Sequence, residues 1–251
     1  MKIGSSLLKG FKFLSLNQIE MKLKKLNEGL KESLINNGLT EANVLQQDTF
    51  STIKSGADCL ILAPIGSGKT TTIVINVIQQ LVKEGEQSPR ALIVVQDKDK
   101  VLEMIAMFEK YGKHTDLTVF GVHEKGDMEY DKNFISGGID VLVGTPGKLS
   151  EMFTTAGYNV NRLKMFIVDD ADPILKLRHE TRIMRISNSI VKTQRIIFAT
   201  DLTERVESLA DKMLDEPFEF DYDDEDFEED EDEVTEEESA ESGDVEEVKE
   251  D

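Results

Sequence analysis

Eight residues, 63–70 (APIGSGKT), have the composition and spacing of a phosphate-binding loop. Closely spaced glycines let backbone N–H groups converge on an anion, the lysine can reach the β- and γ-phosphates of a nucleotide, and the threonine hydroxyl can ligate Mg²⁺. An alanine stands where this pattern usually begins with glycine, so a glycine-rich turn that binds nothing is the alternative interpretation. We interpret the loop as a nucleotide site, with the candidate residues Gly66, Ser67, Gly68, Lys69 and Thr70.

A phosphate loop needs a strand before it and a helix after it, and the sequence predicts both. Residues 58–63 (DCLILA) form a short apolar run that is typical of a buried strand. From Thr70 onward, isoleucine and valine recur at the spacing of a helix whose apolar face packs on a sheet. The start of this helix adds positive potential to the loop, because helix N-termini attract anions.

Two carboxylates, Asp169 and Asp170, follow another apolar run at 165–168. In a fold that already holds a phosphate loop, the first can hold Mg²⁺ through its waters and the second can orient the attacking water. The alternative is that both aspartates only cap the next helix. With the loop, the pair predicts Lys69, Asp169 and Asp170 as catalytic residues, and Thr70 and Asp169 as the metal site.

Apolar runs alternate with amphipathic segments along the body of the chain. This alternation predicts parallel βαβ units, and therefore an α/β fold with one parallel sheet and helices on both faces. Ligands of such sheets bind at the carboxyl ends of the strands, where the residues singled out above fall. The expected strands are 58–63, 91–95, 117–120, 140–143, 165–168, 195–198 and 216–220, and the expected helices are 26–37, 43–55, 99–111, 147–153, 203–214 and the run from Thr70.

The negative charge of the protein is concentrated near its carboxyl end. The formal net charge is −21, and residues 221–251 hold 20 of the 50 acidic residues but one of the 29 basic ones. Such a segment cannot bury enough apolar surface to offset its ordering entropy, so we expect an acidic, disordered tail. Three roles are open for it: a solubilising tail, a binding segment for basic partners, and an internal mimic of RNA that covers a basic groove.

The composition also indicates where in the cell the protein is expected. The chain has no apolar run long enough to span a bilayer and no N-terminal pattern of a secretory signal. Its lone cysteine, Cys59, excludes a disulfide framework, and we expect a cytoplasmic location. Residues 1–20 lack a clean apolar period, so we interpret them as an extension of the domain or as sequence upstream of a true start at Met21.

Five motifs in order resemble those of the N-terminal RecA-like domain of DEAD-box RNA helicases, across residues 21–220. Gln46 stands 23 residues before Lys69, as the family's spacing requires. The resemblance rests on the whole set of five motifs in the family's order, and not on any single motif. The counterparts are the Q motif at 38–46 (GLTEANVLQ), motif I at 63–70, the TPGR element at 145–148 (TPGK), the DEAD box at 169–172 (DDAD) and SAT at 198–200 (FAT).

This resemblance implies that the domain binds ATP with Mg²⁺ and binds RNA. Gln46 would read the adenine edge through its amide, whose donor and acceptor match N7 and N6. Leu39 holds the place of the family's aromatic residue beside the base. The implied contacts to the RNA backbone fall on Lys98, Gly121, Thr145, Gly147 and Lys148, of which Lys148 adds positive charge.

Several positions depart from the family's pattern. Asp170 replaces the catalytic glutamate, so its carboxylate lies one methylene farther from the attacking water. Phe198 replaces the serine of SAT, which the family uses to link the DEAD box to unwinding. Residues 96–101 replace the RNA-contacting PTRELA stretch, and Met21 replaces an aromatic residue that stacks on adenine. We also expect the second RecA-like domain to be absent, because the acidic segment begins where an interdomain linker would stand.

Two functions are consistent with this pattern. The first is an ATP-binding, RNA-binding helicase-like protein with slow or partner-dependent ATP hydrolysis and no autonomous unwinding, since an arginine finger from a second domain is worth on the order of 10³–10⁵ in rate. The second is a degenerate helicase-like scaffold or nucleotide switch that binds a basic partner through its acidic tail. We expect ATP binding in both cases and weak or partner-assisted RNA binding.

Overall fold

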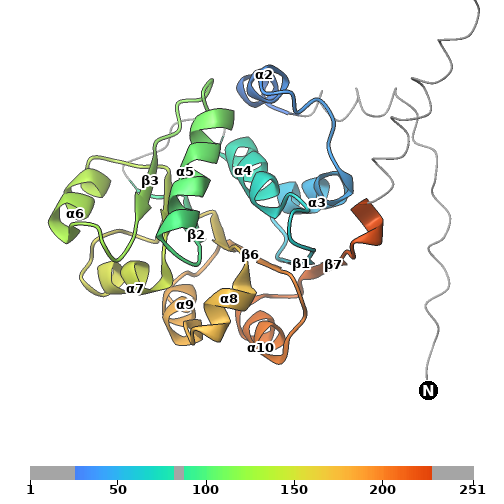
Figure 1. Ribbon diagram of the computed structural model, residues 1–251. Helices are drawn as coiled ribbons and strands as arrows, with labels where there is room; N and C mark the ends of the chain where they lie inside the picture. Colours follow the sequence, from blue (N-terminus) through green and yellow to red (C-terminus); the bar gives the residue numbers. More distant parts are fainter. Residues whose placement is uncertain (1–25, 82–87, 228–251) are drawn as a thin grey trace, which may run out of the picture.

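The computed structural model describes residues 26–81 and 88–227. Within these ranges the chain forms a seven-stranded sheet in the order β3-β4-β2-β5-β6-β1-β7, with helices on both faces (Figure 1). Each neighbouring pair of described strands is parallel. The predicted α/β fold with one parallel sheet is therefore confirmed. The extension 1–20, Met21 and residues 228–251 lie outside the described residues.

The helices and strands are short and follow one another along the chain. The strands are β1 Cys59–Leu62, β2 Ala91–Val94, β3 Val119–Val122, β4 Val141–Gly144, β5 Met165–Val168, β6 Gln194–Ala199 and β7 Phe218–Asp221. The helices are α2 Glu28–Asn36, α3 Val44–Ser55, α4 Lys69–Gln80, α5 Lys98–Tyr111, α6 Met128–Ser136, α7 Pro146–Thr154, α8 Ala171–Lys176, α9 Glu180–Ser187 and α10 Glu204–Met213.

Two hydrophobic cores lie on opposite faces of the sheet. Successive strand residues face opposite sides, so Cys59 and Ile61 of β1 join one core, whereas Leu60 and Leu62 join the other. The first core lies under α2 to α5 and the second under α6 to α10, as Figure 1 shows. Because the inner strands are buried on both faces, they are apolar throughout, which explains why the sequence predicted most of them closely.

Three helices and the position of one strand differ from the expectation. Helices α6, α8 and α9 were not predicted. Helix α6 turns the large side chains of Tyr130 and Phe134 outward, which hides its period, and α8 has only six residues, including Pro173. Strand β3 lies two residues later than predicted, because Val119 to Val122 pair in register with the whole of β4. Strand pairing, which local sequence does not report, decides this position.

The ordered domain continues past the predicted boundary at residue 220. Strand β7 pairs with β1, and the N–H of Tyr222 donates to the carbonyl of Leu62 at 3.0 Å. Tyr222 and Phe227 pack against the core under α2 to α5, and the Tyr222 hydroxyl lies 3.5 Å from Oδ2 of Asp48 on α3. Residues 222–227 therefore leave the sheet at its carboxyl edge and pass α3 (Figure 1).

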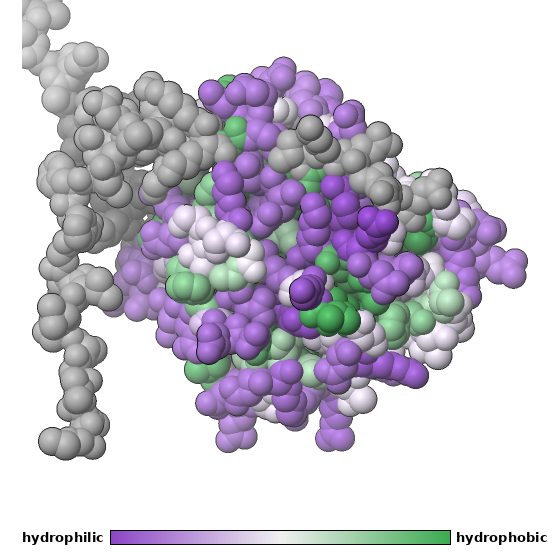
Figure 2. All heavy atoms as spheres, turned by 180° about the vertical axis from the view of Figure 1, so that it is seen from behind, coloured by the Kyte–Doolittle hydropathy of each residue, from purple (hydrophilic) through white to green (hydrophobic). Residues whose placement is uncertain are grey.

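The surface seen from behind is mostly hydrophilic. Figure 2 shows a small group of hydrophobic side chains near the middle of this face, surrounded by polar ones. None of the helices in the described ranges is long and apolar enough to cross a membrane. The expected cytoplasmic location remains a prediction.

Candidate nucleotide site

The loop between β1 and α4 has the backbone that a phosphate cradle requires. Gly66 and Gly68 have φ angles of 91° and 88°, a left-handed conformation that glycine adopts without steric cost. Helix α4 begins directly after Gly68, and none of the described side chains caps its N-terminus. The first N–H groups of α4 therefore point at the space where an anion would lie.

The Lys69 ammonium is buried within this loop. It is 6% exposed, and its Nζ donates to the carbonyl oxygens of Ala63 at 2.7 Å and Pro64 at 2.9 Å. The same atom lies 3.5 Å from Oδ1 of Asp170. The structure thus brings together the lysine and the second aspartate that the sequence predicted to act in one site, 101 positions apart in the chain.

Asp169 stands at the end of β5 with a carboxylate that is not fully satisfied. Its Oδ2 accepts a hydrogen bond from the Thr70 hydroxyl at 3.4 Å, and its buried Oδ1 has no hydrogen-bond partner among the described residues. Burial raises the pKa of Asp169 to about 7, and the nearby charge of Asp170 adds to this rise. The charges of Lys69 and Lys100 act in the opposite direction.

These oxygen atoms fit the predicted Mg²⁺. A carboxylate with a spare oxygen beside a hydroxyl is a hard donor pair, and Mg²⁺ is usually held by one or two such groups together with phosphate and water oxygens. The described part of the chain contains no group of three or more His, Cys, Asp or Glu side chains that could hold a metal by themselves. Asp169 and Thr70 would hold the ion only in the presence of a nucleotide.

Asp170 and Asp172 follow the end of β5, and Asp172 links this end to that of the neighbouring strand β6. Asp170 adopts a left-handed conformation, with φ 47° and ψ 67°, and begins α8. For a non-glycine residue this conformation costs roughly 1–2 kcal/mol. Asp172 accepts a hydrogen bond from the backbone N–H of Thr200 at 2.7 Å, while Phe198 is fully buried. The DDAD and FAT segments are therefore linked through the main chain of Thr200, a contact that sequence reasoning missed.

The amide of Asn43 bonds to the phosphate loop, and the amide of Gln46 bonds to Asn43. Asn43 caps α3, and its Nδ2 donates to the carbonyl of Ser67 at 2.8 Å. The Oε1 of Gln46 accepts from the backbone N–H of Asn43 at 3.2 Å, which completes a capping box. A Cβ atom on Gly68 would lie 3.1 Å from Nδ2 of Asn43 and 3.3 Å from Nε2 of Gln46, so glycine makes room for both amides. Asn43 was not predicted as a site residue, although the Asn-x-x-Gln spacing indicates the capping box.

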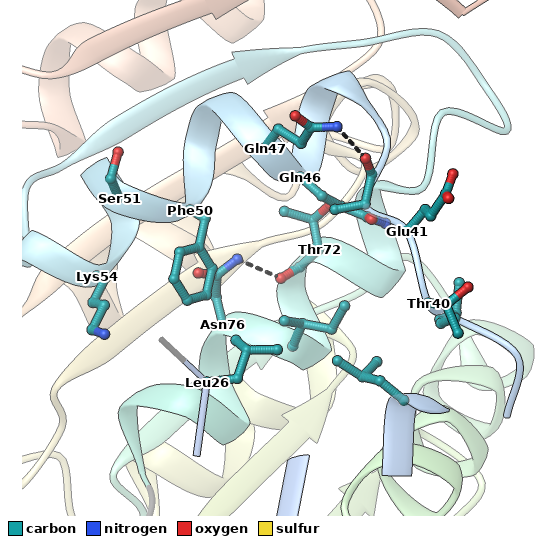
Figure 3. A pocket seen from close by; sticks show the side chains of 14 residues that line it. Leu26, Thr40, Glu41, Gln46, Gln47, Phe50, Ser51, Lys54, Thr72 and Asn76 are labelled. Atoms are coloured by element: carbon teal, nitrogen blue, oxygen red, sulfur yellow. Dashed lines mark hydrogen bonds between the residues drawn. The ribbon is translucent and has the colours of Figure 1, made fainter. Parts of the chain in front are cut away.

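A pocket of about 350 Å³ opens beside Gln46, between α2, α3 and α4 (Figure 3). Gln46, Phe50, Thr72 and Asn76 are among the residues that line it (Figure 3). Its size and apolar character are those of sites that hold planar ligands. The structure thus places Leu39 and Gln46, both predicted to contact the base, in the lining of one cavity. The apolar lining comes mainly from Leu26, Leu34, Leu39, Phe50 and Ile75.

Lys148 does not present its charge to solvent. It is 3% exposed, its Nζ lies 2.9 Å from Oδ2 of Asp131, and it donates to the carbonyl of Gly126 at 3.0 Å. This corrects the expectation that Lys148 adds positive charge to an RNA-binding surface, because the buried carboxylate of Asp131 neutralises it. The ion pair joins α7 to α6, a helix that the sequence did not predict.

The other residues implied in RNA contact have different environments. Thr145 is 1% exposed, and a Cβ on Gly121 would lie 2.7 Å from Cγ1 of Val101, so Gly121 is required by the packing of α5 on β3. Gly147 is partly exposed, and Lys98 is exposed in the first turn of α5. Contact with RNA at this edge therefore remains open to Gly147 and Lys98.

Comparison with known proteins shows which family the sequence matches. A model of the family "DEAD/DEAH box helicase" matches residues 43–208. The chain is 27% identical over 194 residues to the ATP-dependent RNA helicase eIF4A of Eremothecium gossypii, covering 77% of this chain and 49% of that protein. It is 28% identical over 173 residues to the eIF4A of Kluyveromyces lactis, covering 69% and 43%. It is also 28% identical over 206 residues to the probable ATP-dependent RNA helicase CG8611 of Drosophila melanogaster, covering 74% and 21%. The chain spans about half the length of the two eIF4A relatives.

Proposed function

Because the chain belongs to the DEAD/DEAH box helicase family, we propose that it binds ATP with Mg²⁺ and RNA, hydrolyses ATP slowly or with a partner, and does not unwind RNA alone. The observation that carries this proposal is the meeting of Lys69, Thr70, Asp169 and Asp170 at the carboxyl edge of the sheet. Four residues from two distant segments supply a cation, a metal-binding oxygen pair and a carboxylate for the attacking water.

The base of the nucleotide would occupy the pocket beside Gln46. The Oε1 of Gln46 already accepts the N–H of Asn43, which fixes the orientation of the amide. Its Nε2 can therefore donate to N7 of a purine, and the second lone pair of Oε1 can accept from the N6 amino group of adenine. Guanine presents an oxygen at that position, where the oxygen of Gln46 would repel it.

The phosphates would lie over the first turn of α4. There the Lys69 ammonium would exchange the carbonyls of Ala63 and Pro64 for phosphate oxygens, which carry more negative charge. Mg²⁺, when bound, neutralises the charge that develops on the phosphates. Asp170 would orient the attacking water, but its short side chain and its contact with Lys69 hold the carboxylate back toward the loop. This is the reason for proposing slow hydrolysis.

Titration with fluorescent ATP and GTP analogues tests the nucleotide site. We expect the parent protein to prefer ATP, Gln46→Ala to lose that preference, and Lys69→Ala to bind neither nucleotide well. Gln80→Ala is the control, because this glutamine at the end of α4 donates to the carbonyl of Ile53, does not line the pocket and should leave the preference unchanged. Equal affinity of the parent for ATP and GTP would refute the role of Gln46.

A scaffold or nucleotide switch that binds a basic partner is the second candidate. It is favoured by the course of the acidic segment, which leaves the sheet at the same edge as the phosphate loop and contacts α3 through Tyr222. ATP turnover by the purified protein, with and without RNA, separates the two candidates. Nucleotide binding without any turnover above that of Lys69→Ala would favour the switch.

A further inference from the structure

A carboxylate lies against the surface of α7 at its N-terminal turn. Thr145, Pro146 and Lys148 are buried, and Gly147 is the residue of this turn that reaches the surface. A Cβ built on Gly147 would lie 2.9 Å from Oε1 of Glu124 and 3.8 Å from its Cδ. The exposed Glu124 side chain, from the loop after β3, therefore rests directly on the glycine.

The turn beneath this carboxylate has the character of an anion position. None of the described side chains caps the N-terminus of α7, a helix of nine residues. The hydroxyl of its N-cap residue, Thr145, is buried and has no hydrogen-bond partner among the described residues. The positive end of the helix dipole is thus available, while the ammonium of Lys148 is neutralised by Asp131.

A histidine lies within electrostatic reach of Glu124. His179, which precedes α9, contacts the guanidinium of Arg182 through Nδ1. Partial burial and the charge of Arg182 lower the pKa of His179, whereas the charge of Glu124 acts to raise it. The negative group that lies beside the N-terminal turn of α7 thus belongs to the protein itself.

We propose that Glu124 is an internal competitor of the RNA backbone. Its carboxylate covers Gly147 at the N-terminal turn of α7, and an RNA phosphate binds at Gly147 only after displacing it. This inference rests on the proposed RNA binding and adds a residue that lowers the affinity of the protein for RNA. Glu124 does not alter the nucleotide site, because it lies over α7 and not over the phosphate loop.

Titration of single-stranded RNA by fluorescence anisotropy tests the proposal. Glu124→Gln keeps the size of the side chain and removes its charge. We expect it to bind RNA on the order of fivefold more tightly than the parent at low salt, with a smaller difference at high salt, because the repulsion is screened. Glu129→Gln is the matched control, since Glu129 is exposed on α6 and removes the same charge elsewhere.

The outcomes separate this inference from the proposed function. Suppose that the parent binds RNA and that Glu124→Gln binds it no more tightly than Glu129→Gln. This result would overturn the competitor role alone. No RNA binding by any of the three proteins would overturn the proposed RNA binding together with this inference. A second readout needs no RNA: the pKa of His179, measured by NMR, should fall in Glu124→Gln and stay constant in Glu129→Gln. An unchanged pKa in Glu124→Gln would contradict the placement of the carboxylate.

Discussion

Replacing Asp169 by asparagine should stabilise the nucleotide-free protein above pH 7 and abolish its Mg²⁺-dependent nucleotide binding. Asp169 is buried, one of its oxygens has no partner among the described residues, and its pKa is about 7 against an ordinary value of 3.8. The folded protein therefore holds this proton more tightly than the unfolded chain. The contribution of Asp169 to the free energy of unfolding falls as the pH rises from about 4 to about 7, and is constant above that range.

The size of the effect follows from the two pKa values. At about 1.4 kcal/mol per pH unit, the interval from 3.8 to about 7 corresponds to roughly 4 kcal/mol of destabilisation at pH 8. This cost already includes the attraction of Lys69 and Lys100, since both charges lower the pKa. Asparagine removes the cost, but its buried amide still needs hydrogen-bond partners. We therefore expect Asp169→Asn to raise the free energy of unfolding by roughly 1–4 kcal/mol at pH 8 and by less at pH 5.

Urea denaturation at pH 5 and pH 8, with and without ATP and Mg²⁺, measures this directly. The nucleotide should stabilise the parent and leave Asp169→Asn unchanged, because a ligand stabilises only a fold that binds it. Asp201→Asn, at an exposed position on the same edge of the sheet, is the control and should show neither effect. A variant that is less stable than the parent at pH 8, or a gain that does not depend on pH, would refute the reasoning.

Three further predictions follow from the site and the acidic segment. Asp170→Glu should raise ATP turnover under RNA saturation, since it restores the missing methylene; a variant no faster than the parent would show that another step limits the rate. Asp131→Asn should lower the free energy of unfolding in urea by roughly 3 kcal/mol, because it leaves the buried ammonium of Lys148 unpaired; an unchanged stability would contradict the buried pair. A chain ending at Phe227 lacks 15 acidic residues but keeps β7, and it should bind single-stranded RNA more tightly than the full chain at low salt, with a difference that shrinks as salt rises. Identical affinities at low salt would leave the segment a solubilising role or a role in binding a basic partner.

Features that depend on neighbours in the chain could be predicted from the sequence. Glycine spacing and the lysine at 63–70 indicated the loop, because left-handed backbone and phosphate contact are local requirements. Buried parallel strands such as Met165–Val168 were predicted with their observed bounds, since a strand covered on both faces must be apolar throughout. The approach of Lys69 to Asp170 was also foreseeable, because parallel strands bring their carboxyl ends to one edge.

Features that depend on residues far apart in the chain could be seen in the fold alone. The positive charge of Lys148 is visible in the sequence. Its burial against Asp131 comes from the packing of α6 on α7. In the same way, the acidic composition after residue 220 hid the packing of Tyr222 and Phe227 against α3 and the core. Glu124 reads as an ordinary loop residue until the fold lays it on Gly147. Charge is visible in a sequence, but whether a charge is paired, buried or held over a helix end is set by which segments the fold brings together.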